Sequence, residues 1–467
     1  MNTDLGYPTH HLARTLDIEI DEESIYSGEA LTLLSRAPYD GCAFPLVLKI
    51  ILLIVMDKDS AVVMKPRSNT VAFVRRIKEM APNSNEVWVR PLYYNAPRSS
   101  SSIHYCDLVS LLFQLVGRVQ YSEVSEPLAP VSLDLVGICN LVHIKCTTWG
   151  KDRVFIRLAQ QNSTTLESLI IHTDGDIDIA GIIKGSDSNF AVYPHLHTLK
   201  LTGYSDDGDL VHPVFTGAMP FPSLQFLSYD YNYAFSDDVF FRDNAATLAS
   251  LDLYLNSSTI TMLRKFGVFT PTSHPKLRQV RLWGLNDCGP YVFATIAEAM
   301  QFALGIGSAA PIRDIDIYFT DAGRIPMIPQ LDSLTFIQVL ALSAHTLELW
   351  DVISLIEALP MLSDLSVSPG RVGTLPDGIT LDELPAYVIS TYAPMGKRFR
   401  SWNIGTFRGG SFAIEIQCVL LLALVCPNFT HIVLQRGNRK SFAEQLEGET
   451  ASTVFKPYAP RFQCFIV

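Results

Sequence analysis

The sequence predicts an α/β solenoid, in which one short strand and one returning segment repeat along the whole chain. Three observations favour this fold. A phrase with the spacing apolar-x-x-apolar-x-apolar recurs, its copies are mostly 24 to 37 residues apart, and several intervals between copies carry a helical apolar pattern. A chain of 467 residues is also longer than one ordinary hydrophobic core organises, so it needs either several domains or a stacked array.

The clearest form of the phrase begins with proline. It reads PLVLKIIL from Pro45, PHLHTLKL from Pro194, PSLQFLSY from Pro222, PKLRQVRL from Pro275, PMLSDLSV from Pro360, PNFTHIVL from Pro427 and PRFQCFIV from Pro460. A second form has a polar start followed by Thr-Leu, as in NSTTLESLII from Asn162, NAATLASLDL from Asn244 and SAHTLELWDV from Ser343. Each copy predicts one strand of a common sheet.

The central apolar residue of each phrase marks the expected position of its strand. These residues are Leu16, Ile50, Ile144, Leu169, Leu199, Leu227, Leu251, Val280, Ile315, Trp350, Leu365, Trp402, Ile432 and Phe465. The interval from Val87 to Ile144 is unusually long and leaves room for one more strand. Residues 1–127 are therefore expected to hold divergent repeats and residues 128–467 clearer ones, in a single array spanning 1–467.

Helices are predicted in the intervals where apolar residues recur at i, i+3 and i+4. These segments are YCDLVSLLFQLV from Tyr105, DRVFIRLAQQ from Asp152, PYVFATIAEAMQFALG from Pro290, VISLIEAL from Val352 and FAIEIQCVLLLALV from Phe412. The other intervals are polar and predict irregular returns.

The strands themselves alternate apolar and polar residues, as in Leu251-Asp252-Leu253-Tyr254 and Ile315-Asp316-Ile317-Tyr318. Such alternation indicates a sheet with one buried and one solvated face. The prediction is therefore an α/β leucine-rich-repeat-like solenoid (horseshoe), with a parallel concave sheet and helical or irregular convex returns. The alternative is a series of ordinary α/β units, whose parallel strands are usually apolar throughout.

Composition restricts the function classes. The net charge of -11 opposes binding to nucleic acid and to anionic membrane surfaces. The most apolar stretch, from Phe44 to Met56, is too short to span a bilayer, and the N-terminus lacks the apolar core of a signal peptide. The eight scattered cysteines are expected to be reduced. We expect a cytoplasmic protein, and a nuclear location is the alternative.

Motifs of enzymes and cofactor sites do not fit their context. Gly305-Ile-Gly307 follows a predicted helix rather than a strand, and the sequence from Asp174 lacks the glutamate that closes a calcium loop. His195 and His197 would share one face of a strand, without further metal ligands nearby. We therefore expect a chain that is not an enzyme and binds no metal or organic cofactor.

The phrases QQNSTTLESLII, YPHLHTLKL and FPSLQFLSY resemble those of fungal F-box and leucine-rich-repeat-like proteins. In that family an N-terminal F-box docks on the adaptor of a cullin-type ubiquitin ligase, and the repeats capture a substrate. The resemblance covers the repeat region from about Leu16 to Val467, and no F-box was found in the few residues before it.

Three functions follow as hypotheses. The first is a non-enzymatic scaffold that binds a protein partner on its concave face. The second is a substrate receptor of a cullin-type ubiquitin ligase, with its F-box missing or unrecognised. The third is a divergent enzyme whose site is carried on loops.

The candidate partner-binding residues occupy equivalent positions of successive phrases. In apolar-x-x-apolar-x-apolar-x, the residue between the last two apolar positions and the residue after them project from the solvated face. The residues at these positions are Asp252 and Tyr254, Arg281 and Trp283, and Asp316 and Tyr318, extended by Asp230 in the preceding phrase. Aromatic residues and arginine carry much of the binding energy at protein interfaces. In the alternative interpretation, Arg281 bridges the two aspartates and the rings only cover their neighbours.

Overall fold

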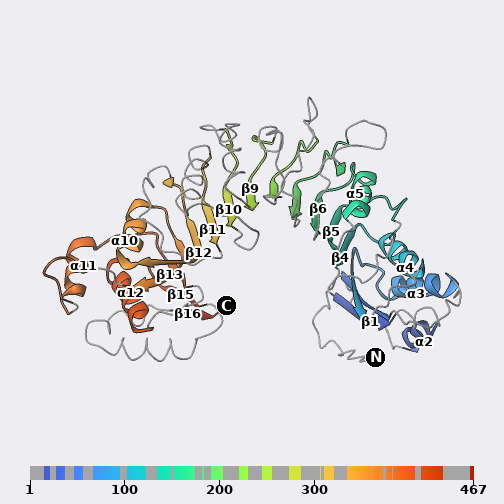
Figure 1. The fold of residues 1–467 in the computed structure, drawn as a ribbon, viewed down its shortest axis with the longest axis horizontal. Helices are drawn as coiled ribbons and strands as arrows, with labels where there is room; N and C mark the ends of the chain where they lie inside the picture. The colour runs from blue at the N-terminus through green and yellow to red at the C-terminus, as the bar shows by residue number, and fades with distance from the viewer. Residues whose placement is uncertain are drawn as a thin grey trace. The chain divides into compact units, whose positions relative to one another are not determined.

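A computed structural model gives the arrangement of the chain (Figure 1). The structure describes residues 15–21, 28–36, 47–55, 67–94, 103–122, 133, 135–148, 152–173, 181–182, 191–202, 220–229, 244–254, 273–284, 306, 310–319, 334–371, 375–380, 382–404, 412–434 and 463–466. The chain divides into two compact units, residues 1–239 and 240–467. The prediction of a single array over 1–467 stays a prediction.

The first unit is a parallel sheet with helices between several of its strands. Its strands are β1 (Thr15–Asp21), β2 (Val47–Val55), β3 (Glu86–Tyr94), β4 (Arg118–Ser122), β5 (His143–Thr148), β6 (Ser168–Thr173), β7 (Thr198–Thr202) and β8 (Phe226–Tyr229). Its helices are α2 (Glu29–Arg36), α3 (Arg67–Met80), α4 (Ile103–Phe113) and α5 (Asp152–Gln161). Each strand pairs in parallel with the next strand along the chain.

The second unit repeats this construction. Its strands are β9 (Ser250–Tyr254), β10 (Gln279–Gly284), β11 (Asp314–Phe319), β12 (Val339–Glu348), β13 (Asp364–Arg371), β14 (Ser401–Ile404), β15 (His431–Leu434) and β16 (Gln463–Ile466). Its helices are α10 (Leu349–Ala358), α11 (Leu384–Tyr392) and α12 (Phe412–Val425). Its strands are again parallel and ordered as in the chain.

Sequential strand order distinguishes both units from a doubly wound sheet. In a doubly wound sheet the order reverses at a switch point, where ligands usually bind. Among the described strands of each unit the order never reverses. The structure therefore shows α/β units with open parallel sheets, as the sequence predicts at that level.

The proline phrases form the same turn each time. In the phrase from Pro194, the Leu196 amide donates to the Tyr193 carbonyl oxygen at 3.3 Å, so proline occupies the second position of the turn. Its fixed φ suits that position. Equivalent bonds join Leu224 to Phe221, Leu277 to His274, Leu362 to Leu359 and Phe429 to Cys426. The starts of the phrases at Pro45 and Pro460 lie outside the described residues.

The Thr-Leu phrases share a different turn. The amides of Thr165 and Leu166 both donate to the Asn162 carbonyl oxygen, and those of Thr247 and Leu248 to the Asn244 carbonyl oxygen. The buried Asn162 side chain also donates to the Ile138 carbonyl oxygen at 2.9 Å and accepts the Leu141 amide at 2.9 Å. A buried amide bonded in this way fixes the end of α5 against the approach to β5.

The apolar positions of the phrases form the core. Rows of fully buried side chains run across neighbouring strands. In the first unit one row is Val119, Ile144, Leu169, Leu199 and Leu227, and in the second Leu251, Val280, Ile315, Leu340 and Leu365. The helix α5 covers this side in the first unit, because Phe155 and Leu158 are buried while Arg153 and Arg157 are exposed.

One predicted strand position, Trp350, lies outside its strand, and two others, Ile50 and Phe465, lie in the expected strands but out of register. Trp350 lies in the first turn of α10, because the phrase from Ser343 is the end of β12 and the start of that helix. The strand position belongs to Leu340, which pairs with Ile315 and Leu365. Ile50 pairs with Ile18, so Leu48 is the partner of Leu16.

The third error lies at the last strand, where Cys464 rather than Phe465 pairs with Ile432. A shift of one residue places Phe465 on the other face of the strand.

Other predicted features are found where they were expected. The segments predicted as helices from Tyr105, Asp152, Val352 and Phe412 overlap α4, α5, α10 and α12, and the one from Pro290 lies outside the described residues. The strand expected between Val87 and Ile144 is β4. Cys139, Cys146, Cys418 and Cys426 are free thiols.

No helix within the described ranges has the length and apolar character needed to cross a membrane.

Candidate functional site

The predicted partner-binding residues lie on three adjacent strands of the second unit. In β9, β10 and β11, Arg281 pairs with Asp252 on one side and Asp316 on the other. Trp283 pairs in the same way with Tyr254 and Tyr318. The register thus brings six of the seven predicted residues into two parallel rows, and Asp230 lies outside the described residues.

The charged row lies on the face opposite the buried leucines. Leu251 and Leu253, which flank Asp252, are both in the core, as are Val280 and Leu282 on either side of Arg281. Alternation along a strand therefore turns the charged residues to the other side of the sheet. We call this side of each unit the open face.

Trp283 covers part of this row. Its indole N–H donates a hydrogen bond to Asp252 Oδ1 on the neighbouring strand. Only 3% of the Asp252 surface is exposed, although the sequence pattern predicted a solvated position. The ring of Trp283 remains half-exposed, so it can contact a partner while it also orients the aspartate. The side chains of Tyr254 and Tyr318 are not among those described.

Asp316 carries a carboxyl group in an unfavourable setting. Burial raises its pKa, the nearby Arg281 guanidinium lowers it, and the Asp252 carboxylate raises it again. Its Oδ1 atom is buried without a hydrogen-bond partner. Within the described residues no ion pair joins Arg281 to Asp316, so the predicted alternative of a simple bridge over both aspartates does not hold for this pair.

Two further aspartates extend this acidic surface. Asp314 and Asp364 occupy one row of the open face, on strands β11 and β13 with Val339 of β12 between them. Burial raises the pKa of Asp314, the charges of Arg313 and Arg281 lower it, and that of Asp364 raises it. Sequence reasoning missed both residues, because it considered only the two polar positions after the central apolar residue and not the one before it.

The histidine pair is placed differently from the prediction. His195 and His197 lie in the turn before β7 rather than within a strand. His195 is exposed, and His197 is half-buried. Among the residues that the structure describes, no group of three or more histidine, cysteine, aspartate or glutamate side chains could hold a metal ion.

Comparison with known proteins adds no assignment to this geometry. Neither the sequence models of known protein families nor the curated proteins match the chain.

Proposed function

We propose that this chain is a non-enzymatic scaffold for protein–protein interaction, built as a leucine-rich-repeat-like solenoid that binds a protein partner on its open sheet face. One observation carries the proposal. The sheet register aligns Asp252, Arg281 and Asp316 in one row, and Tyr254, Trp283 and Tyr318 in the row beside it.

This arrangement suits a protein ligand because of what each row contributes. Neighbouring strands lie about 4.8 Å apart, so the register places three aromatic residues at successive positions, beside a row of three charged residues. Tryptophan, tyrosine and arginine are the residues that most often dominate binding energy at protein interfaces. Charges beside such anchors select the partner by complementarity.

The electrostatics of Asp316 are consistent with this role. A carboxylate that burial disfavours, and that lacks a hydrogen bond to one of its oxygens, does not stabilise the fold. A partner that supplies a donor to this oxygen would satisfy it. The acidic row therefore favours a partner with a basic or hydrogen-bond-donating segment at this place.

The test is partner capture by a triple variant, Tyr254→Ala, Trp283→Ala and Tyr318→Ala. If the aromatic row anchors the partner, losing it should weaken binding by more than about 2 kcal/mol, or roughly 30-fold. Quantitative mass spectrometry of proteins retained on the immobilised chain measures this loss.

A matched control removes exposed apolar side chains elsewhere. Val136, Phe336 and Ile389 are 67%, 58% and 39% exposed and lie outside the two rows, so their replacement by alanine should leave capture unchanged. Equal recovery of the same proteins by the triple variant and the wild-type chain would contradict the proposal. Circular dichroism of both variants checks that the fold is kept.

A further inference from the structure

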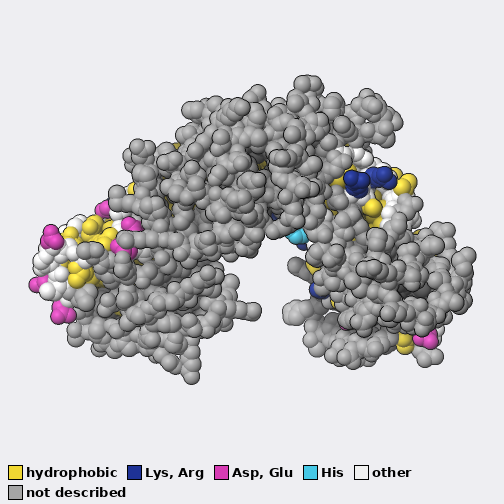
Figure 2. All heavy atoms as spheres, viewed as in Figure 1, with side chains coloured by type: hydrophobic (Ala, Val, Ile, Leu, Met, Phe, Trp, Pro, Cys, Tyr) yellow, Lys and Arg dark blue, Asp and Glu magenta, His cyan; other side chains and the backbone are white. Residues whose placement is uncertain are grey.

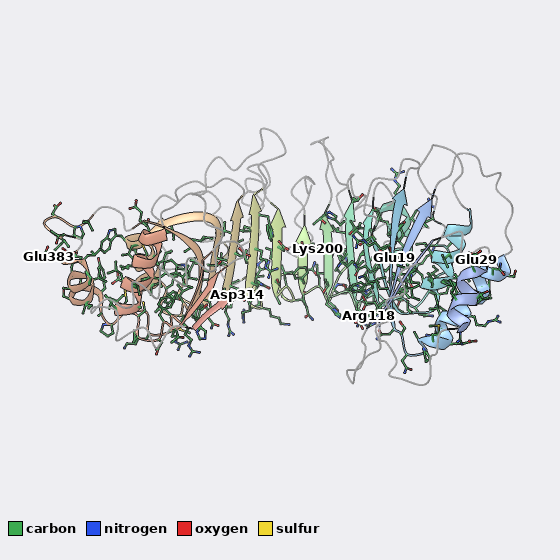
Figure 3. All side chains as sticks on the ribbon, turned by 90° about the horizontal axis from the view of Figure 1, so that it is seen from below. Glu19, Glu29, Arg118, Lys200, Asp314 and Glu383 are labelled. Atoms are coloured by element: carbon green, nitrogen blue, oxygen red, sulfur yellow. The ribbon has the colours of Figure 1, made fainter. Side chains whose placement is uncertain are left out.

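The open face of the first unit carries a set of cations that sequence analysis did not single out. The register aligns Gln120, Lys145, Ile170, Lys200 and Ser228 in one row of β4 to β8. The row before it contains Glu86, Arg118, His143, Ser168 and Thr198. Arg118 and Lys200 are labelled in Figure 3. We call Arg118, His143, Lys145, His172 and Lys200 the cationic strip.

These side chains are accessible from solvent. Arg118 and His172 are exposed, and Lys145 and Lys200 are half-buried. Lys145 and Lys200 stand on strands separated by one other strand, so their backbones lie about 9.6 Å apart. Ile170 of β6 lies between them in the same row and is also partly exposed. The strip thus offers two ammonium groups on either side of an apolar surface.

Among the described residues, no carboxylate forms an ion pair with the arginine or the lysines of the strip, Arg118, Lys145 and Lys200. Glu86 is the acidic residue nearest to them in the rows, and its carboxylate already accepts the Trp88 indole N–H.

The two histidines of the strip lie near its basic side chains. Burial lowers the pKa of His172, and the Lys200 charge lowers it further. Burial also lowers the pKa of His143, which Glu86 raises and which Arg118 and Lys145 lower. The contributions of Lys200, Arg118 and Lys145 are smaller than that of burial, and they show that basic side chains lie near both imidazoles.

We infer that the cationic strip binds an extended acidic segment of a protein partner, with carboxylates on either side of an apolar side chain. This inference rests on the proposed function, that the open face binds protein. An extended chain places residues i, i+2 and i+4 on one face and spans about 13 Å between the first and the last of them, a distance that the long side chains of Lys145 and Lys200 can reach. Ile170 between the lysines suits an apolar side chain better than it suits a phosphate backbone. The overall charge of -11 further disfavours nucleic acid.

The experiment measures binding of a fluorescein-labelled synthetic peptide that repeats Glu-Gln-Leu-Gln, by fluorescence anisotropy on the full chain, because this repeat places glutamate, leucine and glutamate on one face of an extended chain. The variant Lys145→Glu with Lys200→Glu should weaken binding by at least about tenfold, because it reverses both ammonium charges. The neutral variant Lys145→Gln with Lys200→Gln should weaken it by less, and its thermal melt shows whether the fold is intact.

The matched control makes the same charge change on the other side of the same unit. Figure 2 shows Lys and Arg side chains gathered at the surface over α5, where Arg153 and Arg157 are exposed. The variant Arg153→Glu with Arg157→Glu should keep the affinity for the peptide within about twofold. A peptide with glutamine in place of glutamate should not bind the wild-type chain.

Several results would overturn the inference. These are absence of peptide binding by the wild-type chain, equal losses in the strip and α5 variants, or tighter binding of a uridine oligonucleotide or of phosphatidylserine vesicles. The triple alanine variant of the aromatic row separates this test from that of the proposed function. If it loses partner capture while the peptide fails to bind the wild-type chain, the proposed function stands and the inference on the cationic strip falls.

Discussion

At the scale of single residues, Asp316 shows how the open face differs from the core. The apolar residues beside it, Ile315 and Ile317, are buried as a stable sheet requires. Asp316 is desolvated and lies near the Asp252 carboxylate, and both effects raise its pKa. A raised acid pKa means that the folded state binds the proton more tightly than the unfolded state. Ionisation of Asp316 therefore lowers the free energy of unfolding at neutral pH.

The variant Asp316→Asn should consequently unfold with a higher free energy than the wild-type chain at pH 7. Because the folded-state pKa lies above the ordinary value of 3.8, the advantage should shrink as pH falls through the folded-state pKa towards 3.8. Urea unfolding followed at several pH values measures it. An advantage that is independent of pH would show that ionisation is not its cause. The variant Ser250→Ala on the same face serves as a control without a titrating group.

At the scale of elements, helix α5 shows how a return segment stabilises its strands. Phe155 is fully buried and packs against Tyr121 of β4, with ring centroids 5.3 Å apart. Asn162 at its end bonds to the backbone that leads into β5. The helix α5 thus contacts β4 through Phe155 and the segment before β5 through Asn162.

Replacing Phe155 by alanine should therefore lower the free energy of unfolding by about 3–5 kcal/mol, the usual cost of removing a buried phenylalanine ring. The change Arg153→Ala on the exposed side of the same helix should have an effect within about 0.5 kcal/mol. Chemical denaturation of both variants provides the comparison. Similar values for the two variants would mean that α5 does not pack against the sheet through this ring.

The elements that sequence could predict are those with two independent signals. Proline phrases give both a proline and a buried apolar residue, and all those within the described residues form the expected strand. The strand β4 has neither the proline nor the threonine signal. Leu334 and Ile337 precede β12 without a proline, so the sequence pattern assigned this strand to the phrase from Ser343 instead. The apolar spacing of the phrase is present at both strands, but short apolar triplets are common in any half-apolar chain, so the spacing alone does not identify a strand.

The candidate site was predictable to a similar extent. Sequence spacing correctly aligned Asp252, Arg281 and Asp316, because equivalent positions of parallel strands pair directly. It could not reveal the hydrogen bond from Trp283 to Asp252 or the burial of that aspartate, since both depend on side-chain conformation. The cationic strip was predictable in part, because Lys145 and Lys200 follow the recognised central residues Ile144 and Leu199, as Asp252 follows Leu251. Arg118 belongs to β4, which neither form of the phrase marks.

At the scale of the whole molecule, the two units present open faces of different charge. Arg118, Lys145 and Lys200 mark the first, whereas Asp314, Asp316 and Asp364 mark the second. Within the described residues, the rows of the first open face thus carry mainly basic side chains and those of the second mainly acidic ones, in a chain of net charge -11. Such separation favours partners that carry both acidic and basic segments.

The central claim is that the open face, rather than the helical side, contacts a protein partner. Site-specific photo-crosslinking tests it most directly, with the photoreactive residue p-benzoylphenylalanine placed at Trp283 or at the exposed Glu357 of α10 in the same unit. We predict a crosslinked protein of defined mass from position 283 and none from position 357. Crosslinking from position 357 but not from position 283 would contradict the account.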